Sequence, residues 1–398
     1  MKLVFDDAEF DGQLQRAISK AYERCSDIGE CLATAQRIHQ GDYDSWYNEW
    51  WATAEKAQQS AEASKAIAAH EVSAREAYLR ACEYYRSAYF FRRSDLDDPK
   101  LLAAWRRQRE CFRAAAALFE HPCEVVEIPY EGTTLSGYFL MPDDSGEPRA
   151  TIVAFPGYDA PVEESYPAAA APALRRGYSA LLFDGPGQAS SLYEKRLYFR
   201  PDYEVVLKAV VDYAVSRPEV DAERIALVGR SFGGFLAPRA ASGEHRFAAL
   251  IADPGQYDLG EIATSRMPKE VVAKVEADDP AVDEVFAGML ADPHRREYFG
   301  SRMATHGTNS MREFLRMLSG YTVRDRAGQI GCPTLVTGNE ADPIAAQARQ
   351  LYDALKCPKE FVFFTEGEGA GGHCEGLGQS LFFQRAYDWL DDVFAAVR

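Results

Sequence analysis

The chain has 398 residues, of which 47% are hydrophobic and 26% are charged, a composition typical of a folded globular protein rather than a disordered one. Its formal charge of −17 argues against nucleic acid or an anionic membrane as a general partner, because like charges repel. No apolar run approaches the length of a transmembrane helix, so the expected partner is a small-molecule substrate.

Residues 1–7 become acidic too early for a secretory signal peptide, so we expect a cytoplasmic protein. The eight cysteines agree with this location, since they show neither the paired spacing of a metal site nor the framework of a small disulfide-rich domain. We therefore expect reduced thiols and no bound metal. A homodimer is left open.

From residue 11 to about residue 119 the hydrophobic pattern is helical throughout. It predicts long amphipathic helices at 45–69, 71–91 and 99–119, with shorter helices before them. The break before the last of these offers aspartates as N-caps and Pro99 for the first turn. The pattern therefore predicts a helical cap domain over residues 1–122.

Aromatic side chains crowd these predicted helices. Most of them are expected to pack between helices, and a few to line a substrate pocket as rigid walls. The residues concerned are Trp46, Tyr47, Trp50, Trp51, Tyr78, Tyr84, Tyr85, Tyr89 and Phe90.

At residue 123 the period changes from helix to strand, and residues 124–140 predict an antiparallel pair with a turn at its centre. Short apolar runs then alternate with helices, which predicts an α/β fold with a doubly wound, mostly parallel sheet. A catalytic domain is expected over 123–398, with a helix-prone insertion at 256–328 that would form a lid over the active site. The predicted parallel strands are 151–155, 179–183, 225–228, 248–252, 334–337 and 361–364, with helices at 203–215, 345–355 and 382–397.

The apolar run 225–228 leads directly into Gly-Arg-Ser-Phe-Gly at 229–233, and a predicted helix follows. In a nucleophile elbow the serine occupies a strained strand-to-helix turn, so that its hydroxyl stands clear of the sheet. Gly229 and Gly233 are expected there because a Cβ at either position would strike the neighbouring strand or helix. The alternative is an ordinary glycine-rich turn, but the strand and helix on either side favour Ser231 as a nucleophile.

A serine nucleophile needs a base to remove its proton and an acid to orient that base. His373 lies on a glycine-rich loop just past the last strand, which favours a base over a surface histidine. The acid is expected after the preceding strand, where Asp342 stands before a proline. Asp253 and Glu340 remain alternative acids.

The oxyanion formed during attack needs preorganised donors. One is expected to be the amide of Phe232, directly after the nucleophile. The other is expected in the Pro-Gly-Tyr-Asp turn at 156–159, from the amide of Tyr158. The Tyr158 hydroxyl either packs or contacts substrate, and Cys374 beside the base is expected to be a small buried filler rather than a second nucleophile.

Four motifs carry a family resemblance: the turn at 156–159 with Glu163-Glu164, Phe-Asp-Gly-Pro-Gly-Gln at 183–188, the Gly-Arg-Ser-Phe-Gly-Gly motif, and Gly-His-Cys at 372–374. Together they resemble the α/β-hydrolase branch that includes 2,6-dihydroxypseudooxynicotine hydrolase and the fungal polyketide chain-shortening hydrolases of pigment pathways. The resemblance covers residue 123 to the end, and the helical segment is similar to that branch's cap. It implies cleavage of a carbon–carbon bond beside a ketone by Ser231, Asp342 and His373, without metal or cofactor.

Because relatives in this branch include plain esterases, the resemblance defines the catalytic machinery better than the substrate. We expect a serine hydrolase with an aromatic-lined pocket between cap and core, acting through an acyl-enzyme. Its substrate would be a mid-sized aromatic or polyketide-like ketone or ester. Two alternatives stay open: an acyltransferase or cyclase with the same triad, and a hydrolase-like binding protein without turnover.

Overall fold

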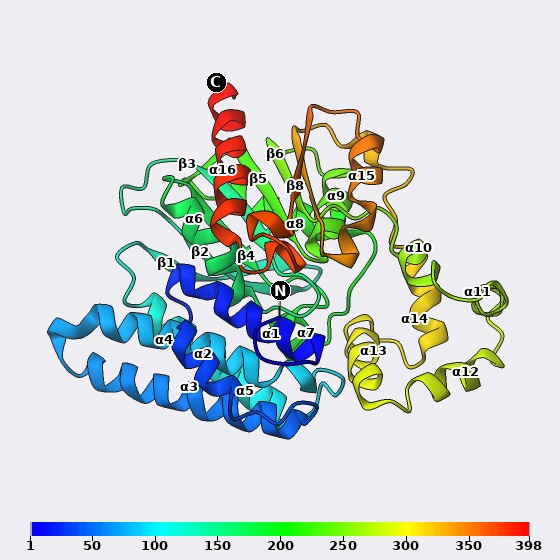
Figure 1. The fold of residues 1–398 in the computed structure, drawn as a ribbon. Coiled ribbons are helices and arrows are strands. Elements are labelled where there is room, and N and C mark those ends of the chain that lie inside the picture. The colour runs from blue at the N-terminus through cyan, green and yellow to red at the C-terminus, as the bar shows by residue number, and fades with distance from the viewer. Residues whose placement is uncertain (1, 398) are drawn as a thin grey trace.

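The structure, a computed structural model, describes residues 2–397 and is built around one eight-stranded sheet (Figure 1). The strand order is β1-β2-β4-β3-β5-β6-β7-β8. β2 is antiparallel to β1 and β4, and the other neighbours are parallel, so the predicted doubly wound, mostly parallel sheet is confirmed. The strands are β1 Cys123–Tyr130, β2 Thr133–Leu140, β3 Arg149–Phe155, β4 Ser179–Phe183, β5 Val220–Arg230, β6 Ala249–Asp253, β7 Thr334–Asn339 and β8 Lys359–Phe364.

Side chains of the central strands alternate between two cores, one on each face of the sheet. In β3, Ile152 and Ala154 join the core that contains α6 and α16, while Val153 and Phe155 join the core that contains α8, α9 and α15. Because both faces are covered, these strands are apolar at almost every position. The covering helices are α6 Ala171–Leu174, α7 Ala189–Lys195, α8 Tyr203–Val215, α9 Gly233–Ala241, α15 Ala348–Ala354 and α16 Gln379–Ala396.

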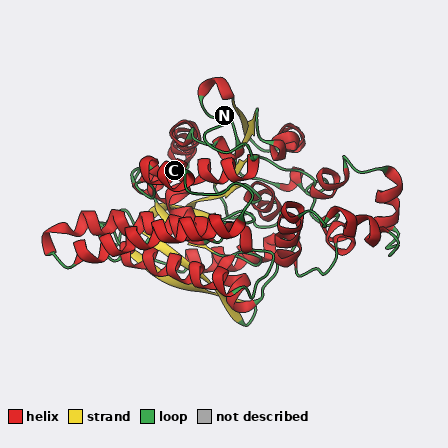
Figure 2. Ribbon diagram, turned by 60° about the horizontal axis from the view of Figure 1, so that its bottom comes forward, coloured by secondary structure: helices red, strands yellow, loops and turns green. Residues whose placement is uncertain are grey.

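The N-terminal helices form a layer against the sheet domain, which we call the N-terminal helical layer (Figures 1 and 2). Aspartate side chains cap four of them, and Pro99 follows one of these aspartates in the first turn as predicted. The predicted helix at 99–119 ends earlier, at Ala116. The helices are α1 Ala8–Ser19, α2 Ile28–Ala35, α3 Tyr43–Lys65, α4 Glu71–Ala88 and α5 Pro99–Ala116.

The aromatic residues of this layer pack mainly against one another. Trp46 and Trp50 are fully buried, with ring centroids 5.8 Å apart. Trp50 in turn contacts the ring of Tyr84 at 5.6 Å, and Trp51 contacts that of Tyr85 at 5.1 Å. These ring contacts hold α3 against α4, which is the packing role predicted for most aromatic residues of the layer.

The insertion at 256–328 forms five short helices that project beside the sheet domain (Figures 1 and 2). Its apolar side chains, such as Leu259, Phe314 and Tyr321, join the core on the α8–α9 face of the sheet. The helices are α10 Leu259–Thr264, α11 Lys269–Glu276, α12 Val282–Met289, α13 Pro293–His306 and α14 Met311–Leu318.

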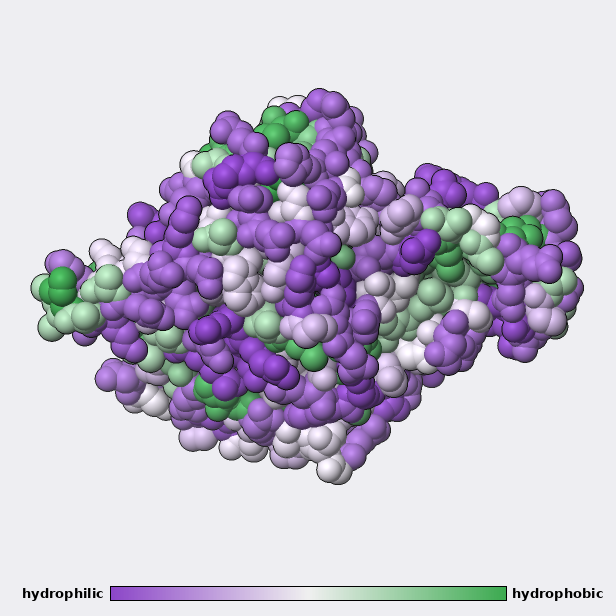
Figure 3. All heavy atoms as spheres, turned by 90° about the horizontal axis from the view of Figure 1, so that it is seen from below, coloured by the Kyte–Doolittle hydropathy of each residue, from purple (hydrophilic) through white to green (hydrophobic). Residues whose placement is uncertain are grey.

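The surface on the face shown in Figure 3 is mostly hydrophilic, with hydrophobic residues in small separate patches. One such patch is at the tip of the α3–α4 hairpin, where Ile67 and Val72 are half exposed. None of the helices within residues 2–397 is both long enough and apolar enough to cross a membrane.

Candidate active site

Ser231 stands in the turn between β5 and α9, with a backbone φ of +58°. This left-handed conformation is unusual for a residue with a side chain and is typical of a nucleophile elbow. A Cβ on Gly229 would lie 2.1 Å from the Gly233 carbonyl oxygen, so glycine is required there. The same expectation is wrong for Gly233, whose Cβ would meet only ordinary contacts at 3.6 Å. The second glycine required is Gly234, where a Cβ would lie 2.0 Å from the carbonyl oxygen of Pro254.

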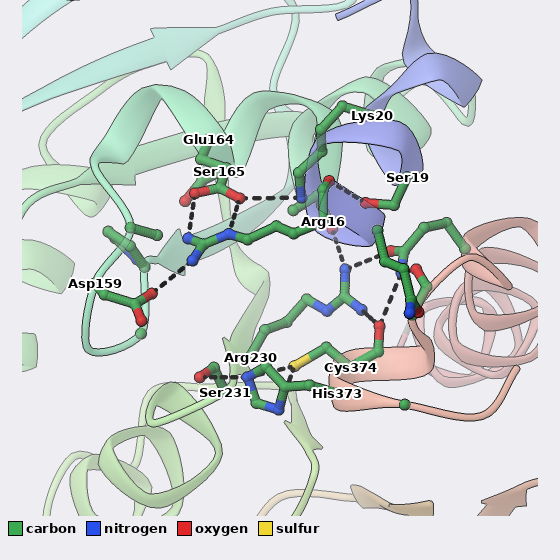
Figure 4. A pocket seen from close by; sticks show the side chains of 18 of the residues that line it. Arg16, Ser19, Lys20, Asp159, Glu164, Ser165, Arg230, Ser231, His373 and Cys374 are labelled. Carbon is green, nitrogen blue, oxygen red and sulfur yellow. Dashed lines mark hydrogen bonds and ion pairs between the residues drawn. The ribbon is translucent and has the colours of Figure 1, made fainter. Parts of the chain in front are cut away.

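The structure brings the three predicted triad side chains together. Nε2 of His373 lies 2.9 Å from Oγ of Ser231 (Figure 4). Its Nδ1 lies 2.8 Å from Oδ2 of Asp342. The other oxygen of Asp342 accepts a hydrogen bond from the Ile344 amide at 3.2 Å, because Asp342 also caps the turn that follows β7. This capping bond orients the carboxylate toward the histidine loop.

The two alternative acids have other partners. Asp253 accepts hydrogen bonds from Nε of Arg230 at 2.6 Å and from the Thr337 hydroxyl at 2.7 Å. Glu340 accepts one from the Glu366 amide at 3.0 Å. Within residues 2–397, neither carboxylate hydrogen-bonds His373, so the geometry favours Asp342 as the acid.

Burial lowers the pKa of the His373 imidazole, but the neighbouring Cys374 sulfur and the Asp342 carboxylate raise it by more, so its pKa lies well above the ordinary value. The imidazolium that forms when a serine loses its proton is therefore favoured here.

Arg230, next to the nucleophile, ties three elements together. Its guanidinium donates to Asp253 at the end of β6 and to the Cys374 carbonyl and Glu375 carboxylate of the histidine loop, at 2.9 and 3.0 Å. It also donates to Gln379 at the start of α16, at 2.9 Å. Sequence reasoning missed this residue, since the position between Gly229 and Ser231 carries no signal of what its side chain reaches.

Asn339, the last residue of β7, also holds the histidine loop. Its amide donates to the Ala370 carbonyl at 2.8 Å and accepts from the Gly372 amide at 3.2 Å. Gly372 has φ +106°, a conformation that other residues rarely adopt, so the loop needs glycine at this turn.

The expected oxyanion donors, the amides of Phe232 and Tyr158, have no hydrogen-bond partner among the described residues. The turn that carries Tyr158 lies against the nucleophile, since a Cβ on Gly157 would be 2.9 Å from Oγ of Ser231. Gln188 of the 183–188 motif holds this turn by donating to the carbonyl oxygens of Pro156 and Gly157. The amides of Phe232 and Tyr158 therefore remain the predicted oxyanion donors.

The Tyr158 hydroxyl, for which packing and substrate contact were both open, hydrogen-bonds Nε2 of His306 in the insertion. The Tyr158 ring stacks on Phe232 at 4.2 Å between centroids. His306 is almost completely buried, and burial followed by the charge of Arg302 lowers its pKa to about 3. It is therefore neutral at physiological pH and joins the insertion to the expected oxyanion turn.

A cavity of about 380 Å³ opens above Ser231, within the range of small-molecule sites. Its roof is α1 and the turn after it, which the sequence did not single out. The expectation of aromatic walls is wrong for this cavity, because Phe155 is the one Phe, Tyr or Trp among its described lining residues. The insertion contributes none of those described lining residues, and its apolar side chains pack on the α8–α9 face of the sheet.

The roof is charged (Figure 4). Arg16 of α1 binds both carboxylate oxygens of Glu164, at 2.7 and 2.5 Å, and Asp159 at 2.8 Å. Burial raises the pKa of Asp159, but Arg16 and Arg93 outweigh it and hold that pKa far below its ordinary value. No group of three or more His, Cys, Asp or Glu side chains within residues 2–397 is arranged to hold a metal ion.

Cys374 lines the cavity and is only partly buried, so the expectation of a buried filler is wrong. Its Sγ lies 3.7 Å from Nε2 of His373. Burial raises the pKa of the thiol, which keeps it in its weakly nucleophilic protonated form.

Comparison with known proteins gives concordant matches. The alpha/beta hydrolase family matches residues 152–389, and an esterase FrsA-like family matches residues 5–253. The chain is 31% identical to hydrolase LUC6 of Fusarium sp over 100% of this chain and 99% of that protein. It is 32% identical to 20-hydroxy-prefusarin hydrolase FUS2 of Gibberella moniliformis over 100% and 99%. The crystal structure of 2,6-dihydroxy-pseudo-oxynicotine hydrolase shares the fold, with a TM-score of 0.75 at 22% identity over 95% of this chain and 96% of that one.

Proposed function

The chain belongs to the alpha/beta hydrolase family, and from this premise we propose that it is a serine hydrolase in which Ser231, His373 and Asp342 form the catalytic triad. The observation that carries the proposal is the continuous chain of hydrogen bonds from Oγ of Ser231 through the imidazole to Oδ2 of Asp342, at 2.9 and 2.8 Å. These distances allow direct proton transfer from the hydroxyl to Nε2.

The proposed reaction has two halves. Ser231 attacks the substrate carbonyl carbon while Nε2 of His373 takes the hydroxyl proton, and the amides of Phe232 and Tyr158 bind the oxyanion. The bond from the carbonyl carbon to the leaving group breaks, and His373 returns the proton to that group. Water, deprotonated by the same imidazole, then hydrolyses the acyl-enzyme to a carboxylic acid and free Ser231.

Two leaving groups suit this machinery: the carbanion equivalent of a ketone, released by carbon–carbon cleavage, and the alkoxide of an ester. The names of 20-hydroxy-prefusarin hydrolase and 2,6-dihydroxy-pseudo-oxynicotine hydrolase support multifunctional organic substrates of moderate size, and the esterase family match supports ester cleavage. The cavity volume of about 380 Å³ is compatible with either class. Polar groups along its wall provide partners for the attacking water, which favours hydrolysis over acyl transfer or cyclisation.

We further propose that residues 1–122 act as a cap domain on a catalytic domain of residues 123–398. The support comes from α1 and the turn after it, where Arg16 and Lys20 line the cavity and pair with Glu164 in the segment after β3. Closing the cavity in this way excludes bulk water and strengthens electrostatic interactions inside it.

The decisive experiment is labelling with a fluorophosphonate together with a panel of aryl esters and β-diketones. The wild type should be labelled, and Ser231→Ala should lose labelling and at least about a thousandfold of turnover, because the triad acts as a unit. Ser319→Ala, an exposed serine at the end of α14, is the matched control and should behave as wild type. Normal turnover in Ser231→Ala would end the assignment.

A further inference from the structure

Two polar groups in the cavity wall have hydrogen-bonding capacity that the protein does not use. Ser165 is only 6% exposed and lines the cavity, yet its hydroxyl hydrogen-bonds no other described residue. Lys20 is 9% exposed and lines the same cavity. Its ammonium group has three donors, but within residues 2–397 it has one ion-pair partner, Glu164 at 3.2 Å.

Glu164, the ion-pair partner of Lys20, is also bound by two arginines. Arg16 binds both oxygens of Glu164 and lies closer to it than Lys20 does, and Arg86 approaches it to 4.0 Å. Arg16 has a second carboxylate in Asp159, and Arg86 has one in Glu83. Lys20 is therefore the cation of this group without a carboxylate of its own. A buried charge is costly unless it is fully compensated. Glu164 carries one negative charge and shares it among Lys20, Arg16 and Arg86, so an anion entering the cavity would gain by binding beside Lys20.

Resting on the serine hydrolase function above, we propose that Lys20 and Ser165 bind a carboxylate that the substrate carries at the end remote from the scissile carbonyl. One ammonium and one hydroxyl supply donors for the two oxygens of a carboxylate. A single negative charge also suits this place better than a phosphate dianion, which would face Glu164 and Asp159. In Figure 4 these residues lie across the site from Ser231 and His373, so one substrate can span both ends.

The test compares p-nitrophenyl half-esters of C5 to C8 dicarboxylic acids with matched esters whose far end is a primary amide. The readout is the ratio of kcat/KM for acid over amide. A hydrogen bond to a charged group predicts that Lys20→Met lowers this ratio roughly tenfold to a hundredfold. Ser165→Ala should lower the acid-over-amide ratio a few-fold. Lys20→Arg keeps the charge and should retain most of the wild-type ratio.

Lys56→Met, an exposed lysine on α3, is the matched control and should leave the ratio unchanged. A purely structural role for Lys20 through Glu164 would lower thermal stability and both kcat/KM values together. An unchanged ratio in Lys20→Met would therefore overturn the carboxylate site even while the enzyme hydrolyses both esters.

A binding measurement separates this proposal from the hydrolase assignment. Suberate should bind Ser231→Ala protein in calorimetry more tightly than its diamide, and adding Lys20→Met should abolish that preference. If fluorophosphonate labelling fails but suberate binds through Lys20, the hydrolase assignment falls and the carboxylate site stands. If suberate and its diamide bind equally, or neither binds, the carboxylate site falls.

Discussion

At the scale of single residues, Arg230 links the proposed nucleophile Ser231 to the proposed base His373 through the backbone that carries each of them. It is the last residue of β5, directly before Ser231, and it donates to the carbonyl of Cys374, the residue after His373. Asp253 compensates its charge from the end of β6 at 2.6 Å. Two carboxylates near the site thus have different partners: Asp342 hydrogen-bonds the His373 imidazole, and Asp253 accepts from Arg230, which also donates to the histidine loop.

This division predicts different defects for two equivalent substitutions. Asp342→Asn should lower kcat by roughly ten-thousandfold with little change in melting temperature, because the amide favours the wrong histidine tautomer. Asp253→Asn should instead lower the free energy of unfolding by about 3 to 5 kcal/mol, because it breaks a buried ion pair. Steady-state kinetics and thermal melts measure both quantities. A larger fall in kcat for Asp253→Asn, at a temperature where both variants are folded, would move the acid to β6.

The raised pKa of His373 predicts the pH dependence of activity. The base must be neutral to accept the serine proton, and a raised pKa keeps it protonated to higher pH. In a plot of kcat/KM against pH, the rising limb should therefore have its midpoint above 6.5, the ordinary pKa of histidine. Activity should be lost as the pH falls through that midpoint.

The neighbouring cysteine provides a control for that profile. The Cys374 sulfur accepts a hydrogen bond from the His373 imidazolium and so contributes to its raised pKa, and Cys374→Ala should therefore move the limb toward lower pH. Cysteine and alanine tolerate the left-handed backbone at this position, φ +46°, equally poorly, so the change tests the sulfur contact rather than strain. If the rising limb of Cys374→Ala stays at the wild-type pH, Asp342 is the cause of the raised pKa of His373.

At the scale of elements, the insertion hydrogen-bonds the expected oxyanion turn through His306, and its Arg302 guanidinium lies 5.4 Å from the centroid of the Tyr158 ring. Nε2 of His306 bonds the Tyr158 hydroxyl, and its Nδ1 bonds that of Tyr321 at 3.1 Å. Since a neutral imidazole has one donor and one acceptor, one hydroxyl must donate to it and the other must accept from it. The insertion therefore packs beside the candidate active site and supports the turn that carries Tyr158.

His306→Phe should retain the ring packing but leave two buried hydroxyls unpaired, at about 1 to 3 kcal/mol for each. We expect a lower melting temperature and a lower kcat, because the Tyr158 amide loses its support. Tyr321→Phe, which removes the far hydroxyl alone, should lower stability without lowering kcat. If kcat in His306→Phe equals that of wild type, the insertion stabilises the fold without positioning the oxyanion turn.

At the scale of the whole molecule, the N-terminal helical layer and the sheet domain share one continuous core on the α16 side of the sheet. They also share the charged contacts of Arg16 and Lys20 with Glu164. The layer therefore supplies both the roof of the cavity and part of the protein interior.

Removal of residues 1–119 should consequently cost both solubility and catalysis. It would expose apolar surface of the sheet domain, and such patches drive association. It would also open the cavity to bulk water and remove Arg16 and Lys20. Size-exclusion chromatography and ester hydrolysis test the two effects. A monodisperse fragment with full activity would show that the layer is an independent appendage.

Local sequence patterns were sufficient to predict the strands and the candidate triad side chains. Apolar runs identified the strands because both faces of the sheet are buried, and the glycine-rich turn after β5 identified Ser231 because the elbow needs that backbone. His373 and Asp342 followed because parallel strands bring their carboxyl ends to one edge. Each of these signals lies within a few residues of the feature it predicts.

Only the tertiary structure decided what covers the site. Arg16 meets Glu164 across 148 residues of chain, and Arg230 meets Glu375 across 145. The aromatic residues that were candidates for the pocket wall pack inside the helical layer, and a polar face of α1 takes their place. Contacts of this kind depend on how whole elements pack, and a helix with several suitable faces does not reveal in its own sequence which neighbour each face will meet.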